Sequence, residues 1–112
     1  MQLSLQEQGN WCVVTVEERR IDAAGAISFK EAMRNLTEGL SGPVILDLGQ
    51  VDFVDSSGLG AIVAAMKTLG GKRRLHLAAM TPNVERVFSL TRMDLVFPLH
   101  ATVAAALLSD DS

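Results

Sequence analysis

Two adjacent serines beside an aspartate are the residues of this chain best suited to chemistry. Ser56 and Ser57 follow Asp55 within the segment VDFVDSSGLGAIV, which spans residues 51–63. A serine hydroxyl can attack a substrate when a base activates it, or it can accept a phosphoryl group from a kinase. A serine or an aspartate at such a position can also simply cap a helix, which is the commoner role. The three residues alone leave these possibilities open.

The sequence offers little support for a catalytic serine. The order Asp-Ser-Ser-Gly-Leu-Gly matches neither the Gly-x-Ser-x-Gly turn of serine hydrolases nor the Gly-Lys-Ser/Thr ending of a phosphate-binding loop. His76 alternates with two leucines and His100 lies near a predicted helix start, so we expect surface or hydrogen-bonded histidines and no catalytic base. No group of His, Asp and Glu has metal-ligand spacing. We therefore expect a protein that is not an enzyme and that needs no metal or cofactor; a nucleotide hydrolase or serine hydrolase is the alternative that a turnover assay would exclude.

Composition excludes several classes of protein. The 112 residues are enough for one domain, 1–112, and the net charge of −3 does not suit nucleic-acid binding. Basic residues cluster only at Arg19-Arg20 and at 72–74, the latter expected to be a solvated turn. Cys12 is the single cysteine, so no intrachain disulfide can form. The N-terminus does not resemble a secretory signal, and no apolar run approaches the roughly 20 residues of a membrane span. These features predict a cytoplasmic protein without membrane contacts.

Strand and helix patterns alternate along the chain. β-Branched runs bounded by turn residues predict strands, and apolar residues spaced three and four apart predict helices. Thr81-Pro82 predicts a helix start, and the Gly70-Gly71 pair predicts a helix end. The predicted strands lie at 2–7, 11–16, 43–48 and 74–79, with an edge strand at 95–99, and the predicted helices lie at 26–40, from 56 to 69, from 82 and at 101–109. The last helix is expected to place Val103 and Leu107 inward and to be followed by a frayed tail.

This β-β-α-β-α-β-α-β-α order predicts an α/β fold with a mixed, mostly parallel sheet of four to five strands and about four helices. The serines then lie between the carboxyl end of a parallel strand and a helix N-terminus, where open sheets bind ligands and partners. Asp55 or Ser56 can cap that helix. Gly58 and Gly60 fall in its first turn, where each costs about 0.5–1 kcal/mol relative to alanine. We therefore expect this turn to be an exposed, smooth surface for close approach.

A family resemblance adds to this interpretation. The segment VILDLGQVDFVDSSGLG, which starts at Val44, fits the pattern (V/I)-x-(L/V)-D-(L/F)-x-x-(V/L)-x-(F/Y)-(I/M/V)-D-S-(S/A)-G-L-(G/A). A predicted helix, a Gly-Gly turn and a strand follow it. In these features, and over nearly its whole length, the chain resembles the STAS domains of bacterial anti-sigma factor antagonists. The resemblance implies a STAS fold whose unphosphorylated form binds an anti-sigma factor and thereby releases a sigma factor.

The resemblance also implies roles for particular residues and partners. The serine directly after the aspartate, Ser56, would be phosphorylated by the anti-sigma factor, which is an ATP-using serine kinase, and a serine phosphatase would reset the switch. The family's Gly-x-apolar-Asp segment corresponds here to Arg-Arg-Ile-Asp, which keeps Asp22 and places Arg19 where glycine is common. The residues implied to shape the partner surface are Asp22, Asp55, Ser57, Gly58, Leu59 and Gly60.

The charge of a phosphate suits such a switch. A phosphoserine adds about −1.5 to −2 charges, and a helix N-terminus stabilises an anion by about 0.3–1 kcal/mol. We therefore expect phosphorylation of Ser56 to leave the fold intact and to disrupt an interface shaped for a neutral hydroxyl. An alternative function is that of a STAS subunit of a lipid-transport ATPase or of a stress-signalling assembly, acting as a docking module. The Asp-Ser-Ser core argues against the transporter.

Overall fold

A five-stranded mixed sheet lies at the centre of the computed structural model, which describes residues 1–70 and 74–110. Its strand order is β1-β2-β4-β6-β7, with β1 antiparallel to β2 and every other pair of neighbours parallel. The strands β3 and β5 form a separate parallel pair. The elements are β1 (Leu3–Gln8), β2 (Trp11–Val16), β3 (Arg20–Ile21), α1 (Ala26–Thr37), β4 (Val44–Asp47), β5 (Phe53–Val54), α2 (Ser56–Leu69), β6 (Leu75–Ala78), α3 (Pro82–Leu90), the 3-10 helix η1 (Met93–Leu95), β7 (Leu99–His100) and α4 (Val103–Leu107).

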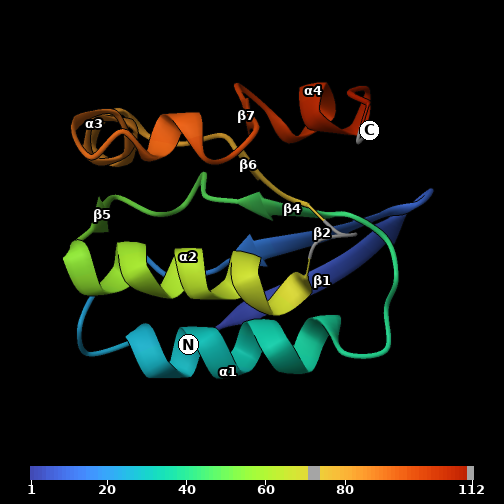
Figure 1. Cartoon of the computed structure of the whole chain (residues 1–112), viewed down its shortest axis with the longest axis horizontal. Coiled ribbons are helices and arrows are strands. Elements are labelled where there is room, and N and C mark those ends of the chain that lie inside the picture. The colour runs from blue at the N-terminus through green and yellow to red at the C-terminus, as the bar shows by residue number, and fades with distance from the viewer. Residues whose placement is uncertain (71–73, 111–112) are drawn as a thin grey trace.

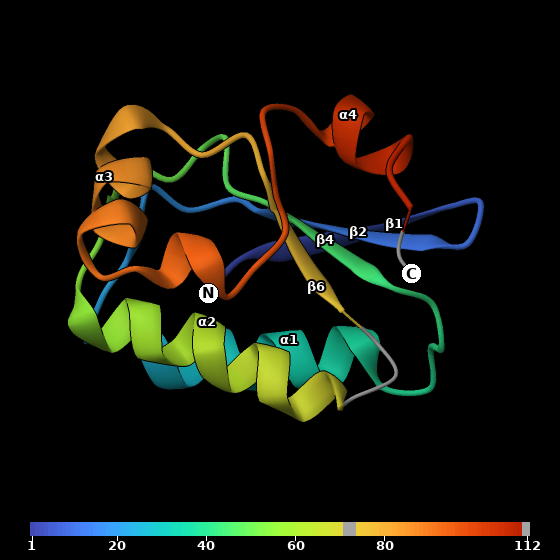
Figure 2. The ribbon, with the colours of Figure 1, turned by 45° about the horizontal axis from the view of Figure 1, so that its top comes forward.

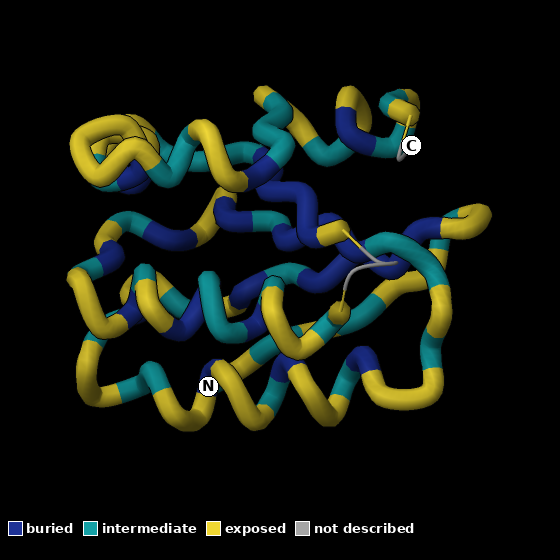
Figure 3. The backbone as a smooth tube through the Cα atoms, viewed as in Figure 1, coloured by how far each residue is buried: buried dark blue, intermediate teal, exposed yellow. Residues whose placement is uncertain are grey.

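Helices cover both faces of this sheet. α1 and α2 pack side by side against one face, α4 lies on the other, and α3 packs beside β5 (Figures 1 and 2). Figure 3 shows that the buried residues follow the strands and the inner sides of the helices. The helices start near the end of the sheet where β4 and β6 end, which places several helix N-termini and their loops at one end of the molecule (Figure 1).

The sequence of the central strands explains this covering on both faces. Successive side chains of a strand point to opposite faces of the sheet. In β2, Val14 and Val16 join the larger core beneath α1 and α2, whereas Trp11 and Val13 join a smaller cluster beneath α4. Neither face of β2 could be left in water, because each buried aliphatic or aromatic side chain stabilises the fold by about 1.5–3 kcal/mol relative to exposure.

Most predicted elements are confirmed. The hairpin has the expected turn, with Leu3 opposite Val16 and Gln8 opposite Trp11. The helix predicted at 26–40 ends earlier, at Thr37, where the next residue adopts an extended backbone. The helix after the serines ends at Leu69, followed by Gly70 with φ of 80°. Gly71, residues 72–73 of the predicted solvated turn and residues 111–112 of the predicted tail lie outside the described residues.

The predicted elements need three corrections, two of them in the C-terminal part of the chain. The edge strand predicted at 95–99 is wrong, because Arg92 adopts a left-handed conformation, η1 follows it, and β7 contains only Leu99 and His100. The last helix is shorter than predicted, and its buried residue is Ala106, while Val103 and Leu107 are only half-buried against the same cluster. The predicted order also lacks β3 and β5, because strands of two residues are too short to show a periodic pattern.

Candidate functional site

Asp55 is the structural centre of the predicted site. It is the N-cap of α2, and its Oδ1 atom accepts a hydrogen bond from the backbone N–H of Gly58 at 2.8 Å. Its Oδ2 atom accepts a second hydrogen bond, of 3.1 Å, from the backbone N–H of Ala23. The same carboxylate therefore caps α2 and attaches the loop before α1 to it. Of the two capping residues that the sequence allowed, the structure selects Asp55.

Ser56 and Ser57 are consequently not needed as caps. Both residues are exposed on the first turn of α2, and neither side chain hydrogen-bonds to another described residue. The backbone N–H groups at a helix start carry partial positive charge, which favours an anion nearby. The hydroxyl of Ser56 is thus accessible to a modifying enzyme, at a position where added negative charge is tolerated.

The two glycines of this turn differ in their surroundings. Gly58 is buried, and a Cβ atom there would lie 1.8 Å from the carbonyl oxygen of Ile21 in β3. Gly60 is exposed, and a Cβ atom there would meet nothing within 4 Å. The expectation of an exposed turn at both glycines is therefore wrong for Gly58, which allows α2 to pack against β3. The same expectation of an exposed turn is correct for Gly60.

Asp22 and Leu59 are two further residues predicted at this surface. Asp22 follows β3, and its carboxylate accepts a hydrogen bond of 3.0 Å from Nε of Arg20. This hydrogen bond holds the pKa of Asp22 below its usual value, against the opposing effect of desolvation, so the carboxylate is charged at neutral pH. Leu59 is half-buried and packs against the main core. Through Asp55 and Ala23, the structure brings the segment after Asp22 beside the first turn of α2.

The strands β3 and β5, which the sequence analysis missed, extend this surface. Arg20 lies opposite Phe53 in their parallel register, and its guanidinium carbon lies 4.2 Å from the centre of the Phe53 ring. Arg19 forms an ion pair with Asp52 through Nε, at 2.9 Å, and also through Nη2. A sign of this surface in the sequence was the pair of arginines before Ile21. The first of them, Arg19, stands where the family pattern has glycine.

The two histidines lie apart from the serines. His76 is 2% exposed on the sheet face covered by α4, with its ring edge-on to Trp11. Its Nδ1 atom lies 2.9 Å from Nε2 of His100, and the two rings are stacked. His76 is therefore a satisfied histidine, as expected, and α2 lies on the opposite face of the sheet.

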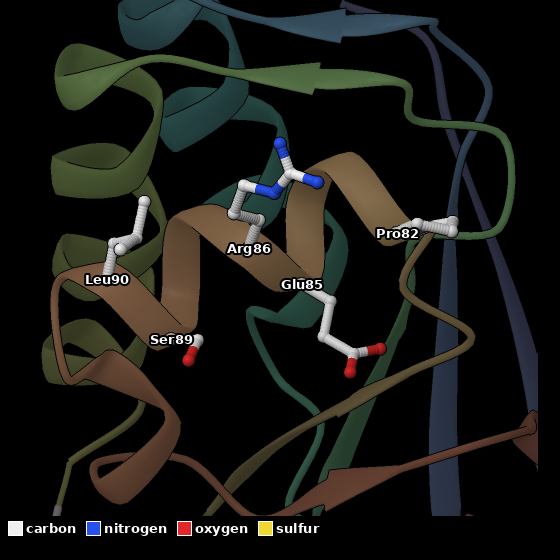
Figure 4. Close-up of a pocket in the computed structure, with 5 residues that line it drawn as sticks. All are labelled: Pro82, Glu85, Arg86, Ser89 and Leu90. Atoms are coloured by element: carbon white, nitrogen blue, oxygen red, sulfur yellow. The ribbon is translucent and has the colours of Figure 1, made fainter.

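A surface cavity lies away from the serines. A cavity of about 410 Å³ lies on α3, where Glu85 and Ser89 point to one side and Arg86 to the other (Figure 4). It contains none of the predicted site residues. Among residues 1–70 and 74–110, no three His, Cys, Asp or Glu side chains are grouped to hold a metal ion. Within the same ranges, every helix is too short or too polar to span a bilayer. The predicted site lies on the exposed first turn of α2.

Comparisons with known proteins identify the family to which this fold belongs. Residues 2–106 match the model of the STAS domain family. A Thermotoga neapolitana protein, named as a putative anti-sigma factor antagonist, is 30% identical over 102 residues, which cover 85% of this chain and 86% of that protein. The crystal structure of an anti-sigma factor antagonist from Mycobacterium paratuberculosis is similar with a TM-score of 0.83 and 29% identity, covering 95% of this chain and 90% of that one. The crystal structure of a Thermotoga maritima protein, also named as a putative anti-sigma factor antagonist, has a TM-score of 0.79 at 26% identity and covers 94% of this chain and 91% of its own.

Proposed function

Because the chain belongs to the STAS domain family, we propose that it is an anti-sigma factor antagonist whose binding is controlled by phosphorylation of Ser56. The unphosphorylated form binds an anti-sigma factor that is also an ATP-using serine kinase, and the sigma factor is released. Transfer of the γ-phosphoryl group of ATP to the Ser56 hydroxyl ends this binding, and a separate serine phosphatase restores it. The chain contributes a binding surface and no catalysis of its own.

The observation that carries this proposal is the division of roles between Asp55 and Ser56. Asp55 provides the helix cap through Oδ1, so the exposed hydroxyl of Ser56 has no structural task that modification would disturb. A phosphate on Ser56 gains about 0.3–1 kcal/mol from the N-terminus of α2. Repulsion from a carboxylate about 6 Å away would cost a few kcal/mol at an effective dielectric near 20. Domains of this size are stable by about 5–15 kcal/mol, so we expect the fold to persist.

The partner surface is proposed to consist of the exposed and half-exposed groups around Ser56. Ser57, Leu59, Gly60 and Asp22 would contact the partner directly. Asp55 and Gly58 would act from beneath, because Asp55 ties two loops together and Gly58 is buried against Ile21. A phosphate on Ser56 that faces a partner surface shaped for a neutral hydroxyl would have to be desolvated in the complex, and that cost falls on the interface and not on the fold.

The test is a phosphorylation and binding assay with a purified anti-sigma factor kinase. Incubation with the kinase and ATP should add one phosphate to the wild-type chain, located at Ser56 by mass spectrometry. In the Ser57→Ala control, the single phosphate should still be located at Ser56. A phosphate on Ser57, Thr81 or Thr91 would overturn the assignment of the site.

Binding of two Ser56 variants to the same kinase separates the effect of charge from the effect of side-chain shape. Ser56→Ala should bind about as tightly as the wild type and should stay bound when ATP is added. Ser56→Asp adds one negative charge where phosphate adds about two, so it should bind distinctly more weakly while keeping a wild-type circular dichroism spectrum. Equal affinities of the two variants would contradict the proposed switch. Recovery of a transporter ATPase in place of a sigma regulator by pull-down would favour the docking alternative.

A further inference from the structure

A small exposed platform lies beside the proposed phosphorylation site. We call it the β3–β5 platform and define it as Arg19, Arg20, Asp52 and Phe53. Phe53 is 40% exposed, although it is a large apolar residue only three positions before Ser56. The carbonyl oxygen of Arg19 accepts hydrogen bonds from the backbone N–H groups of Asp52 and Phe53. The platform is therefore fixed by backbone contacts on the same elements that hold Asp55 and Gly58.

Arg20 is held in a defined orientation on this platform. Its Nε atom donates to Asp22, and its guanidinium group stacks on the ring of Phe53. Its Nη1 and Nη2 atoms make no hydrogen bond to a described residue, and its side chain is 60% exposed. An arginine that is stacked and tethered has already lost much of its conformational freedom, so a further hydrogen bond to its open edge costs less entropy.

Arg19 differs from Arg20 in this respect. Both hydrogen bonds of its guanidinium group are to the same Asp52 oxygen, so its charge is already neutralised by an exposed ion pair. Such surface pairs contribute about 0–1 kcal/mol, and we assign Arg19 no direct contact. Among the described residues of the platform, the open guanidinium edge of Arg20 and the exposed part of the Phe53 ring remain accessible to a partner.

We infer that Arg20 and Phe53 form a second contact point for the anti-sigma factor, and that the partner presents a carboxylate beside an apolar side chain there. This inference rests on the proposed function and names the chemistry of the partner. The two Nη atoms of a guanidinium match the two oxygens of a carboxylate, which gives a bidentate, charge-assisted pair. Aromatic residues and arginine are enriched among the residues that dominate interface energies. The platform is continuous with Ser56 through β5 and Asp55, so one partner can cover both.

The experiment measures binding of the purified kinase that phosphorylates Ser56. All variants are made on a Ser56→Ala background, so that no phosphate is present. Arg20→Ala and Phe53→Ala should each weaken binding about tenfold or more, and Arg20→Glu more than Arg20→Ala. Arg20→Lys keeps the charge and loses the planar fork, so it should recover only part of the affinity. Melting curves and circular dichroism of each variant identify any loss that comes from unfolding.

Matched controls lie away from the platform. Arg34→Ala removes an exposed arginine from the last turn of α1, and Leu108→Ala removes a side chain that is 90% exposed after α4. Both should bind within twofold of the parent chain. Tight binding by the parent and unchanged binding by the folded Arg20 and Phe53 variants would overturn this inference alone. A parent chain that binds no such kinase would overturn the proposed function as well.

Discussion

The backbone of Gly58 lies so close to Ile21 that a Cβ atom on Gly58 would be 1.8 Å from the Ile21 carbonyl oxygen. Ile21 is fully buried in β3, and its carbonyl also accepts a hydrogen bond from the backbone N–H of Asp55. The first turn of α2 therefore packs directly on the backbone of β3. This close approach fixes the position of Ser56 relative to Asp22 and the β3–β5 platform.

Alanine substitutions at the two glycines of α2 should have opposite effects on stability. Gly58→Ala forces a backbone shift and should lower the free energy of unfolding by about 1–3 kcal/mol or more. Gly60→Ala adds a methyl group in open space within a helix and should raise it by up to about 1 kcal/mol. Urea unfolding monitored by circular dichroism measures both. A Gly58→Ala variant as stable as the wild type would contradict the packing described for this turn.

Removing the Asp55 carboxylate should cost much more than removing that of Asp52. Asp55 accepts two backbone hydrogen bonds, from Gly58 and Ala23, so Asp55→Ala loses a cap and a link between two loops. We expect a loss of about 2 kcal/mol or more, since caps are typically worth about 1 kcal/mol and hydrogen bonds to charged groups about 1.5–3 kcal/mol. Asp52→Ala breaks an exposed ion pair with Arg19 and should cost less than about 1 kcal/mol. Similar losses for the two variants would show that Asp55 acts only as a surface charge.

Thr81 provides a similar link on the other side of the site. Its Oγ1 atom donates to the carbonyl oxygen of Val51 at 2.8 Å, which attaches the start of α3 to the segment before β5. Thr81→Val keeps the shape and leaves this carbonyl unpaired, so it should destabilise by about 1–3 kcal/mol. Thr68→Val is the control, because the Thr68 hydroxyl donates to the Ala64 carbonyl within α2. Thr68→Val should destabilise the chain less, since the carbonyl that loses its partner lies in an exposed helical turn that water can reach. Thermal unfolding of both variants decides between these expectations.

The sequence predicted those parts of the fold that depend on long periodic patterns. The 3.6-residue period of apolar residues predicted α2, and the apolar run at 43–48 predicted β4, because these elements bury a continuous face. The location of the site followed from them, since Ser56 lies where a strand passes into a helix. What the sequence could not show depends on contacts between distant segments. The close packing of Gly58 on the Ile21 backbone and the hydrogen bond from Ala23 to Asp55 join residues more than 30 positions apart, and nothing local marks them.

The stacked pair of His76 and His100 should make stability fall in mild acid. Burial, and then the neighbouring His76, hold the pKa of His100 below its usual value. The unfolded chain therefore takes up a proton near pH 6.5 that the folded chain resists, so the stability is fully present above that pH and is lost as pH falls toward the folded pKa. Glu85 and Asp94 are the acidic residues that line a cavity of about 520 Å³ together with His100.

The measurement for the histidine pair is the melting temperature between pH 8 and pH 5.5. The wild-type chain should lose a few degrees over this range. His100→Gln, which cannot take up the proton, should lose less over the same range even if it is less stable at pH 8. An identical pH dependence in both chains would show that the pair does not control acid stability.

The strand order β1-β2-β4-β6-β7 follows the order of the chain, so the sheet can grow at one edge while the protein is being synthesised. β1 and β2 can pair as soon as the hairpin has left the ribosome, and β4 and β6 are then added in turn to the open edge. The segments from β3 to α2, which carry Asp22, Ser56 and the β3–β5 platform, have all emerged once α2 is complete, before β6 and β7 exist. The final edge is β7, which has two residues and offers few unpaired backbone groups to another chain. A nascent or truncated chain that ends before Leu99 would instead expose the edge of β6, an apolar strand that invites association with other unfinished chains.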